Sequence, residues 1–323
     1  MKQYITMGDV YEAKKLVYDI VRKTPLYKAQ DLSKKNKSQI YFKLEFLQDT
    51  RSFKVRGATN FARHLRSEEL NNGLTTYSTG NHGRATAYVA KKLNTDAKIC
   101  ISKNVPKNKI AGIKNSYGKV VIHGNSQDEA QVKAVELSKT EKRAIVPPFD
   151  NKYIICGQAT IGLEILEKIP KLDSILVPLS GGGLISGIAF VIKSIYPDCK
   201  VYGISMEKGA AMYESIKAGK PVRVGEHESL ADSLQGGILF DNQYTYDMVK
   251  KYVDKIILVS EEEIKEAMSY VFKEEHFVLE GAAVVGIAAL LSKKIKSIGG
   301  NSVIVTTGSN VGNNLFLNTL NIK

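Results

Sequence analysis

Lys54 is the residue whose type and setting first suggest chemistry. It stands in the segment 52–58, SFKVRGA, among small and apolar residues and directly before a helical pattern. Buried lysines are rare and mostly functional, because lysine usually keeps its charge at the surface. The alternative is an ordinary helix-start lysine in a lysine-rich protein. Three other segments favour the functional interpretation, because together they look like parts of one anion-binding site: 78–83, 180–183 and 306–310.

The most specific of these is the glycine-rich segment 179–184, LSGGGL, which follows an apolar strand pattern and opens a helical one. Gly181, Gly182 and Gly183 carry no Cβ, so their N–H groups can approach an anion, and the helix dipole adds attraction. An ordinary turn needs only one or two glycines. The third glycine of a dinucleotide fingerprint is replaced by Ser186, and no Gly-Lys-Ser/Thr is present. The pattern therefore favours a small phosphorylated ligand.

The second segment, 78–83, reads STGNHG and lies where a strand pattern ends and a helical one begins. Its hydroxyl and amide groups, together with a helix N-terminus, favour a carboxylate. An ordinary turn and cap is the alternative. The segment 306–310, TTGSN, ends the last strand in the same style. Open parallel sheets bind ligands at the carboxyl ends of their strands, so we expect these segments to converge on one crevice.

Composition limits the class of protein. A chain of 323 residues with 43% hydrophobic and 24% charged residues is expected to form a soluble protein of two domains. No apolar run approaches a membrane span, residues 1–9 lack a signal-peptide pattern, and three scattered cysteines suit a reducing cytoplasm. Only eight of 46 basic residues are arginine, and none cluster with aromatics. The net charge of +13 therefore indicates a lysine-rich surface, and neither nucleic acid nor membrane is an expected partner.

Strand and helix patterns alternate along the chain from about residue 74 to 146 and again from 151 to 306. Such alternation predicts α/β architecture with two open, doubly wound parallel sheets, the smaller inserted into the larger. We expect a large cofactor-binding domain of 1–51 and 146–323, and a small domain of 52–145 carrying the lysine and the asparagine segment. The irregular stretch 221–239 is expected to line the substrate site.

The four motifs together resemble one family. SFKxRGA, STGNHG, GGGL and a terminal hydroxyl-Gly-x-Asn occur in this order, joined by 157–164 (GQATIGLE) and 280–282 (EGA). Over nearly its full length the chain resembles the fold-type II pyridoxal-phosphate enzymes, in the threonine/serine dehydratase and serine racemase branch. The resemblance implies a tryptophan synthase β-like fold, pyridoxal 5'-phosphate as cofactor, an amino-acid substrate and a homodimer.

The resemblance also implies roles for individual residues. Lys54 is expected to carry the Schiff base. The cofactor is expected to contact Phe53, Asn81 at its ring hydroxyl, Thr307 at its pyridine nitrogen, Glu280, and, at its phosphate, Gly181, Gly182, Gly183 and Leu184. The substrate is expected to bind Ser78, Thr79, Gly80, Asn81 and His82.

The implied reaction is β-elimination, in which a 3-hydroxy amino acid such as L-threonine or L-serine gives a 2-oxo acid and ammonia. A desolvated lysine has a lowered pKa, so its free amine can attack an aldehyde and later act as a base. The neutral hydroxyl of Thr307 cannot hold a proton on the pyridine nitrogen as a carboxylate would. The electron sink is therefore milder, which favours elimination over transamination.

Departures from the family pattern narrow this prediction. His82 argues against thiol-adding enzymes, and Thr79 replaces the small serine expected of racemases. The segment 203–206 lacks the family's metal ligands, so no metal is expected, and 13 residues after Asn310 leave no room for a regulatory domain. Residues 83–85 and 230–237 look most like the dehydratases of hydroxyectoine utilisation. A hydroxyectoine-derived substrate or a racemase therefore stays an alternative; outside the family, so do a nicotinamide-dependent dehydrogenase and a non-catalytic binding protein.

Overall fold

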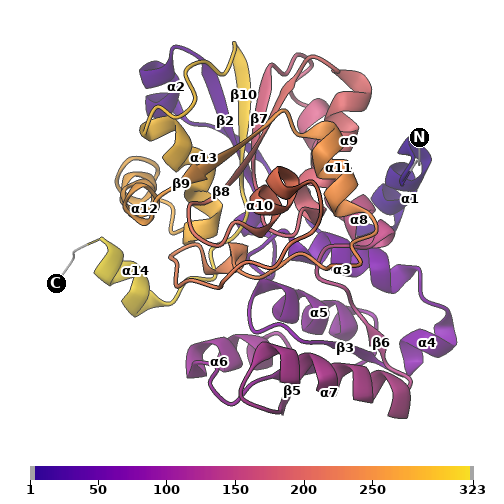
Figure 1. Ribbon diagram of the computed structural model, residues 1–323. Helices are drawn as coiled ribbons and strands as arrows, with labels where there is room; N and C mark the ends of the chain where they lie inside the picture. Colours follow the sequence, from indigo (N-terminus) through magenta and orange to yellow (C-terminus); the bar gives the residue numbers. More distant parts are fainter. Residues whose placement is uncertain (1–3, 321–323) are drawn as a thin grey trace.

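The computed structural model describes residues 4–320, and in that range the larger sheet has six strands in the order β1-β2-β10-β7-β8-β9 (Figure 1). All neighbouring strands run parallel except β1, which pairs antiparallel with β2 at the edge. The sequence pattern did not predict this edge strand. The strands are β1 (Leu26–Lys28), β2 (Gln39–Leu44), β10 (Asn301–Thr306), β7 (Ser174–Pro178), β8 (Lys200–Met206) and β9 (Lys255–Val259).

Helices cover both faces of this sheet. Side chains alternate along each strand, so Leu176 and Ile304 belong to one core cluster while Ile175 and Val303 belong to the other. The first cluster is covered by α2 (Gln30–Asn36), α12 (Glu261–Glu275), α13 (Gly281–Leu291) and α14 (Asn313–Thr319). The second is covered by α8 (Lys152–Leu166), α9 (Gly183–Ile195), α10 (Ala211–Ala218) and α11 (Thr245–Tyr252).

The smaller sheet is parallel throughout and has the order β5-β4-β3-β6. It forms a separate layer beside the larger unit, with α5, α6 and α7 around it (Figure 1). Its strands all fall between β2 and β7 in the chain, as the predicted insertion requires; the domain boundaries themselves stay a prediction. Its elements are β3 (Leu74–Thr76), β4 (Ala97–Ile101), β5 (Lys119–Ile122), β6 (Ala144–Ile145), α4 (Ser67–Asn71), α5 (Asn81–Lys92), α6 (Lys107–Asn115) and α7 (Gln127–Thr140).

One helix joins the two units. α3 (Lys54–Arg63) packs against α8 of the larger unit and α5 of the smaller, and also against α1 (Met7–Val17). It begins at Lys54 itself, so the lysine is the first residue of the helix and does not precede it. The reactive lysine candidate therefore stands at the junction between the two sheets.

The first helix begins with a capping box: Thr6 caps α1, and Asp9, the third helical residue, accepts from the Thr6 backbone N–H. The helix ends at Val17. The stretch 221–239 is irregular as predicted, apart from the short turn η2 (Asp232–Leu234). Within residues 4–320, no helix combines the length and apolar character that crossing a membrane requires.

Candidate active site

Lys54 is held at the end of β10 by its own backbone neighbours. Phe53 N–H donates to the Thr307 carbonyl at 3.1 Å, and Ser52 forms a bridge with Gly308. The Lys54 Nζ donates to the Pro148 carbonyl at 2.8 Å. Lys54 is only partly covered as a residue, but protein surrounds its amine, and this burial lowers the pKa of Lys54 to about 8. An easily deprotonated amine is suited to nucleophilic attack.

The glycine loop lies against the same segment that holds this amine. A Cβ on Gly181 would stand 2.5 Å from the Phe149 ring, and one on Gly183 would stand 2.8 Å from the Phe149 carbonyl oxygen. Gly182 has φ of +89°, which side-chain-bearing residues rarely adopt. Phe149, next to Pro148, therefore requires glycine at this turn. No local pattern indicates that contact, because α8 and β7 separate Phe149 from the loop in the chain.

The first turn of α9 leaves backbone donors at this loop. The N–H groups of a helix's first turn have no partner within the helix, and the dipole makes them attractive to an anion. Here they belong to Gly183, Leu184 and the residue after them. The Leu184 side chain is buried in the core, so only its backbone can face a ligand. The predicted anion site is therefore a backbone site.

The asparagine segment leads from β3 into α5, as predicted. Asn81 and His82 are buried, whereas Ser78, Thr79 and Gly80 are only partly covered. A Cβ on Gly80 would meet nothing within 4 Å, so the segment borders open space. The predicted substrate residues thus divide into a buried pair and an accessible rim.

His82 is a neutral donor in this site. Its Nε2 lies 2.9 Å from the Val146 carbonyl oxygen, which can only accept, so Nε2 carries the proton. Burial, with the nearby charge of Lys54, lowers the pKa of His82 to about 3. The ring is therefore uncharged at neutral pH, and its other nitrogen is an acceptor.

Glu280 and Asn81 meet across the two units. The Asn81 amide nitrogen donates to Glu280 Oε1 at 2.7 Å, and the Asn310 backbone N–H donates to Glu280 Oε2 at 2.9 Å. Burial, with the charge of Asp232, raises the pKa of Glu280 to about 7. The structure thus brings together two predicted residues that are far apart in the chain, and adds Asn310.

A group of four buried charged residues lies directly behind Lys54, and sequence reasoning missed it. Arg56 donates to Glu45 at 2.7 Å and to Glu164 at 2.6 Å, and Lys43 donates to Glu164 at 2.5 Å. We call these four residues the charge quartet. All are almost completely covered. Arg56 and Glu164 lie within the motifs 52–58 and 157–164. Their charge among otherwise apolar residues is the sequence signal that indicates a buried charged group.

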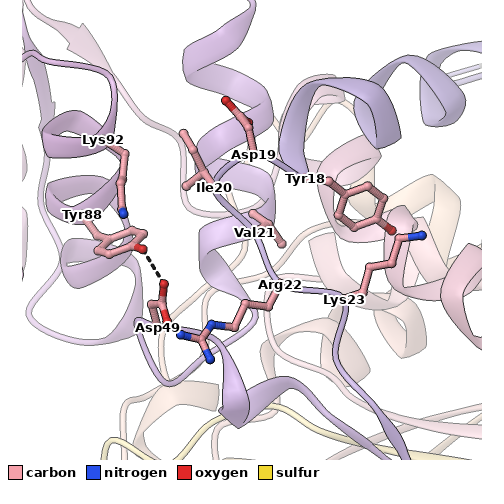
Figure 2. Close-up of a pocket in the computed structure, with 9 residues that line it drawn as sticks. All are labelled: Tyr18, Asp19, Ile20, Val21, Arg22, Lys23, Asp49, Tyr88 and Lys92. Carbon is pink, nitrogen blue, oxygen red and sulfur yellow. Dashed lines mark hydrogen bonds and ion pairs between the residues drawn. The ribbon is translucent and has the colours of Figure 1, made fainter.

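A separate hollow of about 620 Å³ lies elsewhere between the two units (Figure 2). Tyr88 of α5 donates to Asp49 across it at 2.6 Å, and Arg22 is paired with Asp49. None of the predicted site residues lines this hollow. Among residues 4–320, no group of three or more His, Cys, Asp or Glu side chains is arranged to hold a metal ion.

Solved structures of other proteins share this fold. Maize serine racemase has the same fold, with a TM-score of 0.93 and 28% identity, over 99% of this chain and 98% of its own. Threonine deaminase isoform 2 from Solanum lycopersicum gives a TM-score of 0.91 and 33% identity, over 99% and 92% of the two chains.

Sequence relatives agree with the structural ones. A putative threonine dehydratase of Sinorhizobium fredii is 42% identical over 98% of this chain and 96% of its own. The L-threonine ammonia-lyase of Thermotoga maritima is 37% identical over 98% and 78%. Residues 17–308 match the family described as pyridoxal-phosphate dependent enzymes. The predicted fold, cofactor and family are thereby confirmed: the chain belongs to the pyridoxal-phosphate dependent enzymes.

Proposed function

We propose that this protein is a pyridoxal-phosphate-dependent ammonia-lyase that dehydrates a 3-hydroxy amino acid, such as L-threonine or L-serine, to a 2-oxo acid and ammonia. One observation carries the proposal: the buried Lys54 amine, with a pKa near 8, lies beside the neutral His82 and the segment that packs on the glycine loop. Relatives named threonine dehydratase and L-threonine ammonia-lyase support the reaction class.

The residues present fit the cofactor. Backbone donors at Gly183 and Leu184 suit its phosphate, and the Lys54 amine, whose described hydrogen-bond partner is a single carbonyl, suits its aldehyde. Asn81 would meet the ring hydroxyl and Thr307 the pyridine nitrogen. Phe53 is partly buried on the core beside Lys54, where it would pack near the ring. When bound, the cofactor stabilises negative charge at the substrate Cα.

The chain's own groups supply the remaining chemistry. With a pKa near 8, the Lys54 amine is able to accept a proton at mildly basic pH. The N-terminus of α5, with the hydroxyl groups of Ser78 and Thr79, would bind the substrate carboxylate. Because His82 is neutral, it places no second cation beside the Lys54 amine, and the low pKa of Lys54 comes from burial.

Replacing Lys54 tests the proposal. Lys54→Ala is expected to abolish the visible absorption of the lysine-bound cofactor and the release of 2-oxo acid, while circular dichroism keeps its native shape. Lys15→Ala, on an exposed face of α1, is the matched control and should change neither. A borohydride-reducible adduct that persists on another lysine in Lys54→Ala would show that the site is elsewhere.

The preferred substrate belongs to the same proposal. L-threonine, L-serine, hydroxyaspartate and hydroxyectoine-derived amino acids should be compared by kcat/KM, with chiral analysis of unreacted substrate to detect racemisation. A clear preference for the hydroxyectoine-derived compound would favour the subgroup suggested by residues 83–85 and 230–237. Inverted substrate without 2-oxo acid would instead favour the racemase alternative.

Assembly and location complete the proposal. We expect a cytoplasmic homodimer, so light scattering at micromolar concentration should return about twice the chain mass of 35.6 kDa. A mass of one chain would contradict the expected assembly without affecting the proposed chemistry.

A further inference from the structure

Arg84 is packed at the junction between the two units. It lies one turn after Asn81 on α5 and donates from Nη1 to Asn310 Oδ1 at 2.8 Å. Its guanidinium lies flat on Gly112 of α6, where an added Cβ would stand 2.1 Å from Nη2. Within residues 4–320 no carboxylate forms a salt bridge with it. Its described bond is therefore to an amide rather than to an opposite charge.

This contact fixes the orientation of the Asn310 amide. A guanidinium only donates, so the Asn310 atom that faces Arg84 must be its oxygen. The amide nitrogen of Asn310 then donates to the Thr50 carbonyl at 2.9 Å and to Asn81 Oδ1 at 2.6 Å. The oxygen of Asn81 is thereby occupied.

The orientation of the Asn310 amide in turn fixes that of the Asn81 amide. With its oxygen turned to Asn310, Asn81 presents its amide nitrogen to Glu280 Oε1 at 2.7 Å. An amide nitrogen carries two hydrogens, so one N–H remains for another acceptor. Arg84, which can only donate, and the Thr50 carbonyl, which can only accept, together set the donor and acceptor roles along this chain.

We propose that Arg84 is a positioning residue that, through Asn310, holds the Asn81 amide with its N–H side toward the cofactor ring oxygen. The inference rests on the proposed site, in which Asn81 meets that oxygen. An N–H donor favours the deprotonated ring oxygen, whereas the amide oxygen would favour the protonated one. Arg84 therefore influences the cofactor's protonation state without touching it.

A purely structural role predicts something different. If Arg84 only braced the two units, losing it would lower stability in the way that losing another bond between them does. Tyr88 supplies the comparison, because it lies one turn further along α5 and donates to Asp49 of the other unit. Tyr88→Phe removes such a bond without touching Asn310.

Titration of the apoprotein with pyridoxal phosphate separates the two roles. Arg84→Met is expected to raise the cofactor dissociation constant roughly tenfold, as the loss of one well-placed hydrogen bond does. It should also move absorbance from the visible to the near-ultraviolet band, which reports protonation of the ring oxygen. Arg84→Lys keeps a donor-only cation and should recover most of both signals. Tyr88→Phe should change neither.

Gly112→Ala offers an independent variant that keeps the arginine. The added methyl displaces the guanidinium, while alanine favours the helix over glycine by about 1 kcal/mol. We expect the thermal midpoint to hold or rise while the cofactor dissociation constant increases severalfold. A stabilised protein that binds its cofactor less tightly cannot be explained by general loss of structure.

A double variant gives the decisive outcome. If Arg84 acts through Asn81, Arg84→Met should have no further effect on the dissociation constant or the absorption bands in an Asn81→Ala background. Effects that multiply in the double variant, or an Arg84→Met protein with wild-type bands, would overturn the inference. Retention of the visible band in Lys54→Ala would overturn the proposed site and the inference together. Loss of that band in Lys54→Ala supports the site, and the Arg84 variants then test the inference by themselves.

Discussion

The charge quartet and the reactive centre lie on either side of the same helix start, yet their charges are arranged in opposite ways. In the quartet, Arg56 and Lys43 each meet a carboxylate within 2.7 Å. In the reactive centre, Lys54, His82 and Glu280 have no ion-pair partner described within 4 Å. Burial is therefore the largest influence on each group, with no ion pair to oppose it, and it shifts the pKa values to about 8, 3 and 7, in the direction that favours the neutral form.

The difference shows how one short segment combines rigidity with reactivity. Arg56 is fixed by two carboxylates, although burial alone would oppose its charge, and Glu45 and Glu164 raise its pKa above the ordinary value. Two residues earlier, Lys54 is left with one carbonyl partner. The paired charges of the quartet hold the start of α3 in place. The reactive centre has no such pairs, so opposite charge can come from bound ligands.

Arg56→Met is expected to have the largest effect, a loss of stability from unpairing the charge quartet. It leaves Glu45 and Glu164 buried with only Lys43 to balance them, and uncompensated buried charge costs about 3–5 kcal/mol of unfolding free energy. Urea unfolding at neutral pH measures this loss. Arg63→Met is the matched control, because Arg63 lies on the same helix and pairs with Asp19 at the surface. That change should cost no more than about 1 kcal/mol. Equal losses in the two variants would mean that the quartet is not a special anchor.

Glu280→Gln tests the unpaired charge of the reactive centre through the pH dependence of the unfolding free energy. Because burial raises the folded-state pKa of Glu280 from 4.5 to about 7, the folded apoprotein binds this proton more tightly than the unfolded chain does. Its contribution to stability is thus fully present below pH 4.5 and is lost as the pH rises to about 7. The loss is at most about 3 kcal/mol.

Glutamine cannot titrate, so the variant should lack this decline. Unfolding free energies of the wild-type and Glu280→Gln apoproteins, measured by urea at several pH values from 4.5 to 7.5, give the difference directly. His82 contributes the opposite slope up to pH 6.5 in both proteins, so it cancels in that difference. Parallel stability curves would indicate that Glu280 keeps an ordinary pKa.

Local patterns predicted the glycine loop well, and long-range partners poorly. Three glycines between an apolar strand and a helix are a local signal, and α9 begins at Gly183 as that signal predicts. The quartet has no such signal, since Lys43 and Glu164 are 121 positions apart. A charged residue in a strand pattern usually faces solvent, and only the folded chain shows that Lys43 does not.

The candidate site divides in the same way. Asn81 belonged to a local motif, whereas Glu280 entered the prediction through a family resemblance, and nothing in either segment indicates a partner 199 positions away. Asn310 was quoted as part of a motif without a role, and its amide proves to link Asn81 to Arg84. Phe149 was missed, since an aromatic side chain that fills the space beside glycines leaves no periodic pattern.

Ser78→Ala tests whether the substrate carboxylate supplies the negative charge that Lys54 lacks in its surroundings. Ser78 lies on the accessible rim, in the smaller unit, whereas the glycine loop belongs to the larger one. If the substrate carboxylate binds this rim, its arrival supplies an anion near Lys54 and draws the smaller unit toward the larger, excluding water from the reaction. Losing one charge-assisted hydrogen bond of about 1.5 kcal/mol should raise the substrate dissociation constant roughly tenfold.

The cofactor dissociation constant should stay unchanged in Ser78→Ala, because the proposed cofactor contacts do not include this hydroxyl. Spectral titration with substrate and, separately, with pyridoxal phosphate gives both constants on one preparation. Asn81→Ala provides the contrast, since it is expected to weaken both. Unchanged substrate affinity in Ser78→Ala would remove the rim from carboxylate recognition, and the charge that balances Lys54 would then have to come from the cofactor phosphate alone.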